Sequence, residues 1–330
     1  MKFALRWLSW IAACLAATCT AWAQADNYPN RTITVVVPFP AGGLTDVPVR
    51  LAASLLQEKI GQPIVIENRT GASGTIGAAY VARATPDGYT LYANSIGDAQ
   101  SIHFMPLPYH PMDDFANIGW IVDGPPLILT IDATLPIKTI AELVADAKAN
   151  PSKYNFATAG PASSPYATLM RFNAVAGTKI QAVHYRGSGE AATAVATSAI
   201  QGTFTYFSQG KALVDGGKLR ALAIAGPKRM DAWPDVPTLI EAGFDIDIRG
   251  FVGLGAPAKT PKPIVAYLNK RLNEVLQTDT FKKPMAVLGM APPPAADNTP
   301  EKFEKFFRDE IARQGELAAL TGLKIAPQKQ

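Results

Sequence analysis

Short apolar strands alternate with amphipathic helices along most of this 330-residue chain, and this alternation limits the folds that it can adopt. Strands are expected at 32–37, 63–67, 90–94, 127–131, 155–157, 181–185, 202–206 and 219–225, and helices at 46–60, 77–84, 140–149, 164–176, 263–277 and 300–320. Such alternation indicates mostly parallel sheets covered by helices on both faces. The sequence therefore predicts an α/β fold, and its length predicts about two domains. The last two helices are expected to pack back on the first domain.

The first 23 residues have the pattern of a signal peptide. Lys2 and Arg6 precede an apolar run, and Ala21-Trp22-Ala23 supplies a small-x-small cleavage site. We expect cleavage after Ala23 by the Sec route. A membrane anchor is one alternative, and a lipid anchor at Cys14 is another, because the residues before Cys14 resemble a lipobox.

Composition excludes several kinds of site from the exported chain. Both cysteines, Cys14 and Cys19, lie in the signal, so we expect neither disulfides nor thiolate metal sites. The three histidines form no i, i+4 pair, so no metal is expected. The glycines at 71, 74 and 77 lack dinucleotide-binding spacing, and no cofactor is expected. Loss of Lys2 and Arg6 lowers the formal charge from +4 to +2, which gives no argument for a nucleic-acid partner.

Three loops share one design, in which a strand runs into small residues that open a helix. Their candidate ligand-binding residues are Phe39, Ala41, Gly42, Gly43, Leu44 and Thr45 in the first loop, Ala159, Gly160, Ser163 and Ser164 in the second, and Arg186 in the third. The carboxyl ends of parallel strands lie together, and ligands bind there. Small residues let the backbone approach a ligand, and the N–H groups of a first helical turn favour an anion. We therefore predict a carboxylate site held mainly by hydrogen bonds.

Some side chains near these loops have two interpretations. Asp46 is expected to be the N-cap of the helix after the first loop. Ser163 and Ser164 are candidate hydroxyl donors to the ligand, although Ser164 is equally well explained as an N-cap. Tyr166 and Tyr206 are candidates to present a ring to the ligand and a hydroxyl to its polar end.

The segment from Ala93 to Gly97 loosely resembles a nucleophile elbow, with Ser95 after Asn94. It lacks the first glycine, and no histidine stands in a recognisable context to act as a base. We therefore expect no catalytic residues and include Asn94 and Ser95 among the ligand-binding candidates. A hydrolase that uses Ser95 stays as the alternative.

Several motifs occur in order along the exported chain: Tyr28-Pro29-Asn30, Val37-Pro38-Phe39-Pro40-Ala41-Gly42-Gly43 with Thr45-Asp46, Glu67-Asn68-Arg69, Pro86-Asp87-Gly88-Tyr89, Gly217-Lys218-Leu219-Arg220 and Pro234-Asp235-Val236-Pro237. In these motifs the sequence resembles the Bug-type extracytoplasmic solute receptors of the tripartite tricarboxylate transporter family. The resemblance implies a periplasmic-binding-protein (Venus flytrap) fold with two interdomain crossovers. Domain 1 would comprise 24–126 and 250–330, and domain 2 would comprise 127–249.

The resemblance also implies a function. Family members are periplasmic, bind small carboxylates without catalysis and deliver them to membrane permease subunits; we expect a monomer. The loop that matches 158–164 would hold a carboxylate, and the loop that matches 39–45 would contribute backbone groups, partly through water. A ligand-sensing module for a membrane kinase is the alternative role.

This sequence departs from the family pattern at two places. Ala41 and Leu44 make the first loop bulkier and more apolar than is usual. Thr205 and Tyr206 stand where members often carry Asp-Asn, which argues against amino-acid ligands. We therefore expect an aromatic or medium-chain mono- or dicarboxylate, such as terephthalate.

Overall fold

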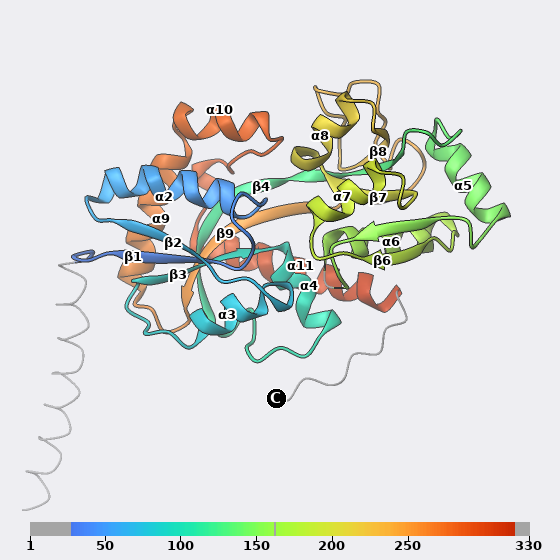
Figure 1. The fold of residues 1–330 in the computed structure, drawn as a ribbon. Helices are drawn as coiled ribbons and strands as arrows, with labels where there is room; N and C mark the ends of the chain where they lie inside the picture. Colours follow the sequence, from blue (N-terminus) through green and yellow to red (C-terminus); the bar gives the residue numbers. More distant parts are fainter. Residues whose placement is uncertain (1–27, 162, 321–330) are drawn as a thin grey trace, which may run out of the picture.

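The long strand β4 (Phe115–Asp132) takes part in both halves of the molecule. The computed structural model describes residues 28–161 and 163–320, so the expected signal peptide lies outside the described residues. The first half of the sheet has the order β2 (Ile64–Asn68), β1 (Ile33–Val37), β3 (Thr90–Ser95), β9 (Arg249–Pro257) and β4. In the second half, β4 pairs with β8 (Leu219–Ala225) and with β7 (Gly202–Tyr206), which is followed by β5 (Asn155–Thr158) and β6 (Gln181–His184). Figure 1 shows the two halves side by side.

The expected parallel pairing holds only for the outer strands. β1 pairs in parallel with β2 and β3, and β5 pairs in parallel with β6 and β7. Every pairing of β4 or β9 is antiparallel. The reason is the path of the chain, because β4 carries it into the second half and β9 brings it back alongside.

The two crossing strands approach each other closely between the halves. A Cβ on Gly124 would lie 2.8 Å from the carbonyl carbon of Gly250, so only glycine fits there without displacing the backbone. The register of β4 with β9 also shifts between Asp123 and Pro126, where two prolines remove ladder donors. The domain boundaries expected at 126/127 and 249/250 fall in these strands and stay a prediction.

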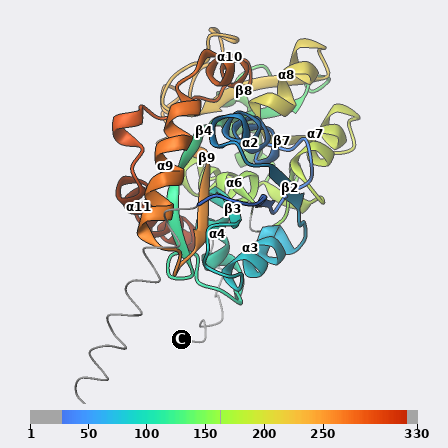
Figure 2. The same cartoon turned by 90° about the vertical axis from the view of Figure 1, so that its left-hand side faces the viewer.

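Helices cover both faces of the first half of the sheet. α2 (Asp46–Ile60) and α9 (Lys262–Leu276) pack on one face, with α10 (Asp279–Val287) beside them. On the other face lie α3 (Thr75–Ala82), α4 (Ile96–Phe104) and the C-terminal α11 (Pro300–Leu320). Figure 2 shows α2 and α9 separated from α3 and α4 by the strands.

The second half is covered in the same way. α5 (Ile140–Ala149) and α6 (Ser164–Ala176) share a core with Phe156 and Phe204 on one face. α7 (Ser188–Ala196) and α8 (Phe207–Asp215) pack on the other. The α/β fold predicted from the alternation is therefore confirmed. α11 packs back on the first half, as expected, and also lies against α6.

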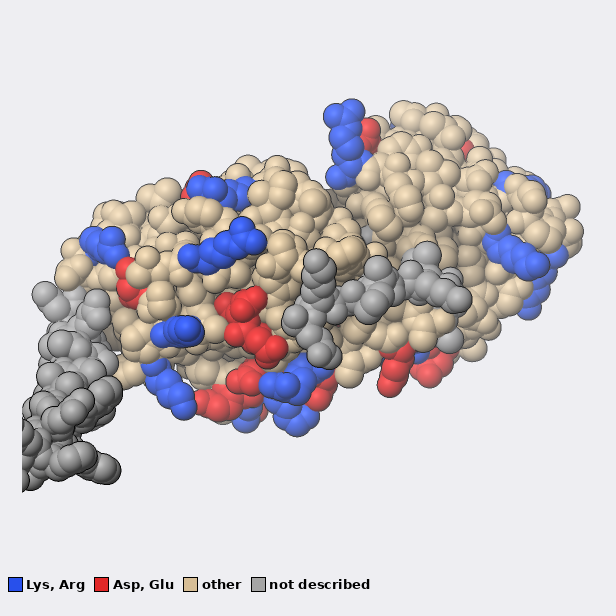
Figure 3. Space-filling view, turned by 90° about the horizontal axis from the view of Figure 1, so that it is seen from below, with Lys and Arg blue, Asp and Glu red and all other residues tan. Residues whose placement is uncertain are grey.

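Charged side chains of both signs are mixed on the surface. Figure 3 shows acidic and basic side chains interspersed on the face seen from below. On α11, Lys305 pairs with Asp309 and Arg308 pairs with Glu304 at i, i+4 spacing. Within residues 28–161 and 163–320, no helix combines the length and the apolar character that a membrane span requires.

Candidate functional site

The starts of α2, α4 and α6 meet between the two halves of the molecule. Leu44, just before α2, packs against the main hydrophobic core of each half. A Cβ on Gly97 would lie 3.6 Å from Phe39 Cζ, so the ring of Phe39 lies over the start of α4. Across the halves, Ser164 Oγ at the start of α6 lies 3.3 Å from Gln100 Oε1 on α4. The first loop and the start of α6 thus both lie against α4, and their joint role in binding a ligand stays a prediction.

Asp46 organises the first loop from within. Its buried carboxylate accepts hydrogen bonds from Gly42 N at 2.9 Å and from Asn68 Nδ2 at 2.8 Å, and Asn68 Nδ2 also donates to Phe39 O at 2.9 Å. The guanidinium of Arg50 adds two further hydrogen bonds. Burial by itself raises the pKa of Asp46, but these hydrogen bonds outweigh it and hold the pKa below its usual value.

The expectation that Asp46 caps α2 is wrong, because Thr45 occupies the N-cap position and its side chain makes no capping bond. Asp46 instead lies in the first turn and reaches back to the loop. Gly43 N also bonds within the loop, to Pro40 O at 3.2 Å. The N–H groups of Gly42 and Gly43 are thus engaged inside the protein, whereas Ala41 and Gly42 lie exposed at the tip.

Both serines of the second loop donate their hydroxyl protons within the protein. Ser163, not Ser164, is the N-cap of α6, and its Oγ donates to Gly160 O at 2.6 Å while accepting from Tyr166 N. Ser164 Oγ donates to Gln100 Oε1. Gly160 has a φ of 108°, which favours glycine at this turn. Neither serine is therefore arranged as a donor to a carboxylate.

Arg186 in the third loop lies apart from these groups. Its side chain is 96% exposed, and its nearest acidic partner is Glu190 at 3.9 Å. The third loop follows β6, which is the edge strand of the sheet in the second half. The structure therefore places this cation at the edge of the sheet and not among the loops that meet between the halves.

Thr205 and Tyr206 point to opposite faces of β7, as successive strand residues must. Thr205 lies against α8, where a Cβ on Gly210 would come within 2.6 Å of Thr205 Cγ2. Its Oγ1 is buried without a hydrogen-bond partner among the described residues. Tyr206 faces α6 within the core of the second half, and burial raises its pKa while a hydrogen bond with Ser164 lowers it. Only Tyr206 thus lies on the side of the second loop.

Tyr166 contacts aromatic side chains of both halves. Its ring lies edge-on to Phe104 of α4, with 6.1 Å between centroids, and to His184 of β6, with 5.2 Å between centroids. His184 Nδ1 is in turn 2.6 Å from Thr158 Oγ1. Sequence reasoning did not single out Phe104, His184 or Gln100. Each is contributed by an element distant in the sequence, and periodicity carries no sign of such pairing.

Asn94 and Ser95 have structural roles in this arrangement. Ser95 caps α4, with its Oγ accepting from Gly97 N and its own N–H donating to Asp98 Oδ2 at 2.8 Å. Asn94 Nδ2 donates to Asn117 Oδ1 inside the sheet. The spacing Ser-x-x-Asp is a capping-box signal that could have been read from the sequence.

No histidine contacts Ser95 in the part of the chain that the structure describes. His103 Nε2 lies 2.7 Å from Ile311 O, His110 Nδ1 accepts from Asp113 N, and His184 bonds to Thr158. The nucleophile–base hydrogen bond of a serine hydrolase therefore has no counterpart here. Among the described residues, no group of three or more candidate ligands is placed to hold a metal ion.

Asp98 is a buried carboxylate behind the cap of α4. Tyr92 donates to its Oδ1 at 2.6 Å. Burial raises its pKa to about 6, although the hydrogen bonds from Tyr92 and Ser95 lower it. Because this value lies above the usual carboxyl pKa of about 4, the folded protein binds the proton more tightly than the unfolded chain does.

We expect this group to make the protein less stable as the pH rises. Its stabilising contribution is fully present below about pH 4 and is lost as the pH rises through about 6. Urea unfolding of the Asp98→Asn variant should lack this part of the pH dependence. Asp309→Asn, at a side chain that is 62% exposed, should keep the wild-type profile. An Asp98→Asn profile parallel to that of the wild type would contradict the prediction.

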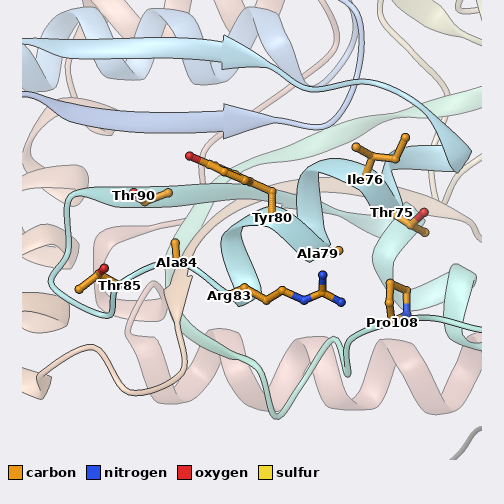
Figure 4. A pocket seen from close by; sticks show the side chains of 9 residues that line it. All are labelled: Thr75, Ile76, Ala79, Tyr80, Arg83, Ala84, Thr85, Thr90 and Pro108. Carbon is orange, nitrogen blue, oxygen red and sulfur yellow. The ribbon is translucent and has the colours of Figure 1, made fainter.

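A separate surface pocket of about 690 Å³ surrounds the outer side of α3. Figure 4 shows its lining side chains, among them Ile76, Tyr80 and Arg83 of α3 or just after it, with Thr90 and Pro108. The Tyr80 ring is also stacked by the guanidinium of Arg69, 3.5 Å from its centroid. None of the predicted ligand-binding residues lines this pocket, so it is distinct from the place where the loops meet.

Comparison with known proteins identifies the family. The model of the tripartite tricarboxylate transporter family receptor matches residues 49–323. The chain belongs to this family. The receptor is 33% identical over 306 residues to protein BugT of Bordetella pertussis, covering 92% of this chain and 93% of that protein. The predicted Bug-type family is thus confirmed.

Solved structures resemble the receptor closely in fold. An R. palustris protein solved with adipate has a TM-score of 0.83 and 30% identity, covering 91% of this chain and 100% of that chain. MatC from Rhodopseudomonas palustris with bound malate has a TM-score of 0.81 and 32% identity, covering 88% of this chain and 100% of that chain. The periplasmic binding protein BugD has a TM-score of 0.81 and 29% identity, covering 91% of this chain and 100% of that chain. The predicted periplasmic-binding-protein fold is confirmed.

Proposed function

We propose that this receptor is a periplasmic solute-binding protein that holds a small carboxylate between its two halves and delivers it to a membrane permease of the tripartite type. The meeting of the starts of α2, α4 and α6 is the observation that carries the proposal. Amides of a first helical turn, together with the helix dipole, favour an anion without a cationic side chain. Relatives solved with adipate and malate support the carboxylate class.

We propose further that the ligand has an aromatic or medium-chain body, as terephthalate does. Leu44 and Tyr206 place apolar surface beside the two loops. Arg186 is exposed away from these loops, so the acid would be held by neutral donors. Binding would favour the closed arrangement, because a ligand that contacts both halves has a higher affinity for that state.

Thermal unfolding of the chain from Gln24 to Gln330 tests this proposal. We expect terephthalate, adipate or malate to raise the melting temperature, because a ligand at 100 times its Kd adds about 2.7 kcal/mol to the free energy of unfolding. Leu44→Glu should abolish the shift by placing a negative charge where both cores meet. Val287→Glu, at a side chain that is 75% exposed, should retain it. A panel of aromatic and aliphatic acids without any shift would count against the carboxylate assignment.

Delivery to a permease is separable from sensing in cells. Deletion of the gene should abolish uptake of the acid that stabilises the protein. Loss of gene induction with normal uptake would instead favour a sensory module for a membrane kinase.

A further inference from the structure

Helix α3 presents apolar side chains both to the core and to the surface. On its inner face, Ala78 and Val81 are fully buried in a core that they share with β1 and β3. On its outer face, Ile76 and Tyr80 are four residues apart and are 54% and 41% exposed. A surface helix normally carries polar side chains on the face that it turns to water. The outer face of α3 is therefore an apolar surface that lies open to solvent, and such surfaces mark sites of interaction.

A cation lies at the C-terminal end of this outer face. Arg83 follows Tyr80 by three residues and Ile76 by seven, so the three side chains share one side of the helix. All three line the pocket of about 690 Å³, and Figure 4 shows the Arg83 side chain extending toward Pro108. Arg83 is the only charged residue among the nine that line the pocket. In the part of the chain that the structure describes, it has no ion-pair partner.

Other arginines of the first half have acidic partners within the protein. Arg31 pairs with Asp87 at 2.7 Å. Arg50 pairs with Asp46, also at 2.7 Å. Arg83 is exposed and keeps its five N–H donors for a carboxylate that comes from outside. The pocket therefore fits an acidic side chain that stands next to an apolar one.

We propose that this pocket docks the receptor onto its permease, by receiving a periplasmic segment of the permease that carries an aspartate or glutamate beside an apolar side chain. The inference rests on the proposed function and adds to it the surface of contact. All nine lining residues lie between Thr75 and Pro108, so the first half alone forms the pocket. Movement of the halves relative to each other leaves such a surface intact. A partner bound there can hold the receptor while the halves separate and the ligand leaves.

A second copy of this chain fits the pocket less well. A two-fold axis through the patch would bring two Arg83 side chains toward each other, because an isologous interface uses the same surface twice. The lining contains no acidic side chain that could lie between them. Charge complementarity therefore favours a different protein with an acidic segment.

Uptake, measured beside ligand binding, tests the proposal. In cells whose chromosomal copy is deleted, we expect Arg83→Glu to lower uptake of the stabilising acid about tenfold relative to the wild type, because the new charge would oppose an acidic segment. Ile76→Gln should also lower uptake, because it removes apolar contact. Both purified variants should keep the thermal shift with the acid, since both side chains are exposed outside the site between the halves. Their melting temperatures report whether the fold survives.

Two controls match these changes in chemistry and exposure. Lys283→Glu reverses a charge on α10, on the opposite face of the sheet, at a side chain that is 78% exposed. Val175→Gln removes an apolar side chain on α6 that is 43% exposed. Neither residue lines the pocket, so both controls should support wild-type uptake.

Photo-crosslinking identifies the partner directly. Replacement of Ile76 by p-benzoylphenylalanine should give an adduct with a tagged permease subunit in intact cells, whereas the same replacement of Val175 should give none. Normal uptake in both Arg83→Glu and Ile76→Gln, or adducts from position 76 only with a second copy of the receptor, would overturn the inference alone. Loss of the acid-induced thermal shift in a folded Arg83→Glu protein would make the pocket a ligand site and would also overturn it. A wild-type protein that no acid stabilises and that supports no uptake would contradict the proposed function and the inference with it.

Discussion

Replacing Asp46 by asparagine should lower the free energy of unfolding by about 3 kcal/mol and abolish ligand-induced stabilisation. The carboxylate is 1% exposed and holds Gly42, Asn68 and Arg50. In the variant an NH₂ group replaces one carboxylate oxygen of Asp46. This group cannot accept the hydrogen bonds that are donated to that oxygen in the wild type. The first loop would then lose the hydrogen bonds that fix it beside α4. Urea unfolding and thermal shift with the acid panel measure both effects.

The dependence on pH separates this effect from a general loss of packing. Because the folded-state pKa of Asp46 is depressed, its contribution is present above about pH 4 and is lost as the pH falls through the folded-state value. Asp46→Asn should therefore be less sensitive to acid than the wild type. Glu304→Gln, in an ion pair whose acidic side chain is 53% exposed, should change stability by no more than about 0.5 kcal/mol. Wild-type stability and ligand response in Asp46→Asn would refute the role given to this carboxylate.

Replacing Phe303 by alanine should destabilise the protein by about 3–5 kcal/mol, because it opens a cavity in a packed aromatic cluster. Phe303 on α11 is fully buried. The centroid of its ring lies 5.0 Å from that of Trp120 and 5.9 Å from that of Phe251. The cluster anchors the C-terminal helix to β4 and β9, which form the junction between the halves. Denaturant unfolding at constant pH measures the loss.

Val287→Ala is the matched control for this truncation. Its side chain is 75% exposed, so we expect a change within about 0.5 kcal/mol. A loss below about 1 kcal/mol for Phe303→Ala would mean that α11 contributes little to the fold.

Elements with strong local signals were predicted almost to the residue. α5 spans Ile140–Ala149 and α6 spans Ser164–Ala176, both as expected. α5 begins with a capping box between Thr139 and Glu142, and α6 ends at Gly177 in the left-handed conformation. Such boundaries depend on residues within one helical turn of each other, so they can be predicted from the local sequence.

Several elements escaped prediction, and β9, the first part of β4 and α10 did so because their local signals are weak. β9 contains three glycines, the first part of β4 contains Gly and Pro, and α10 contains Pro284. Gly253 of β9, a residue type that disfavours strands, is required by a tertiary contact. A Cβ at this position would lie 2.2 Å from Phe303 Cζ. Glycine there makes room for a side chain that follows 50 positions later in the sequence.

The candidate site was likewise predicted only where its signals are local. Small residues between strands and helices identified the first two loops, since backbone exposure and helix starts are local properties. The roles of Asp46 and Ser164 depend on Asn68 and Gln100, which are distant in sequence. Arg186 was a candidate by its position after a strand, yet β6 is an edge strand.

The sequence by itself determined the α/β class, most helix and strand boundaries and the loops that open α2 and α6. These follow from periodicity and from the conformational preferences of a few neighbouring residues. The tertiary structure alone decided which strands carry the chain between the halves, which partners hold the first loop and which group accepts the proton of Ser164. Those outcomes depend on hydrogen bonds and close contacts between distant segments, and a buried polar group takes whichever partner the fold brings to it.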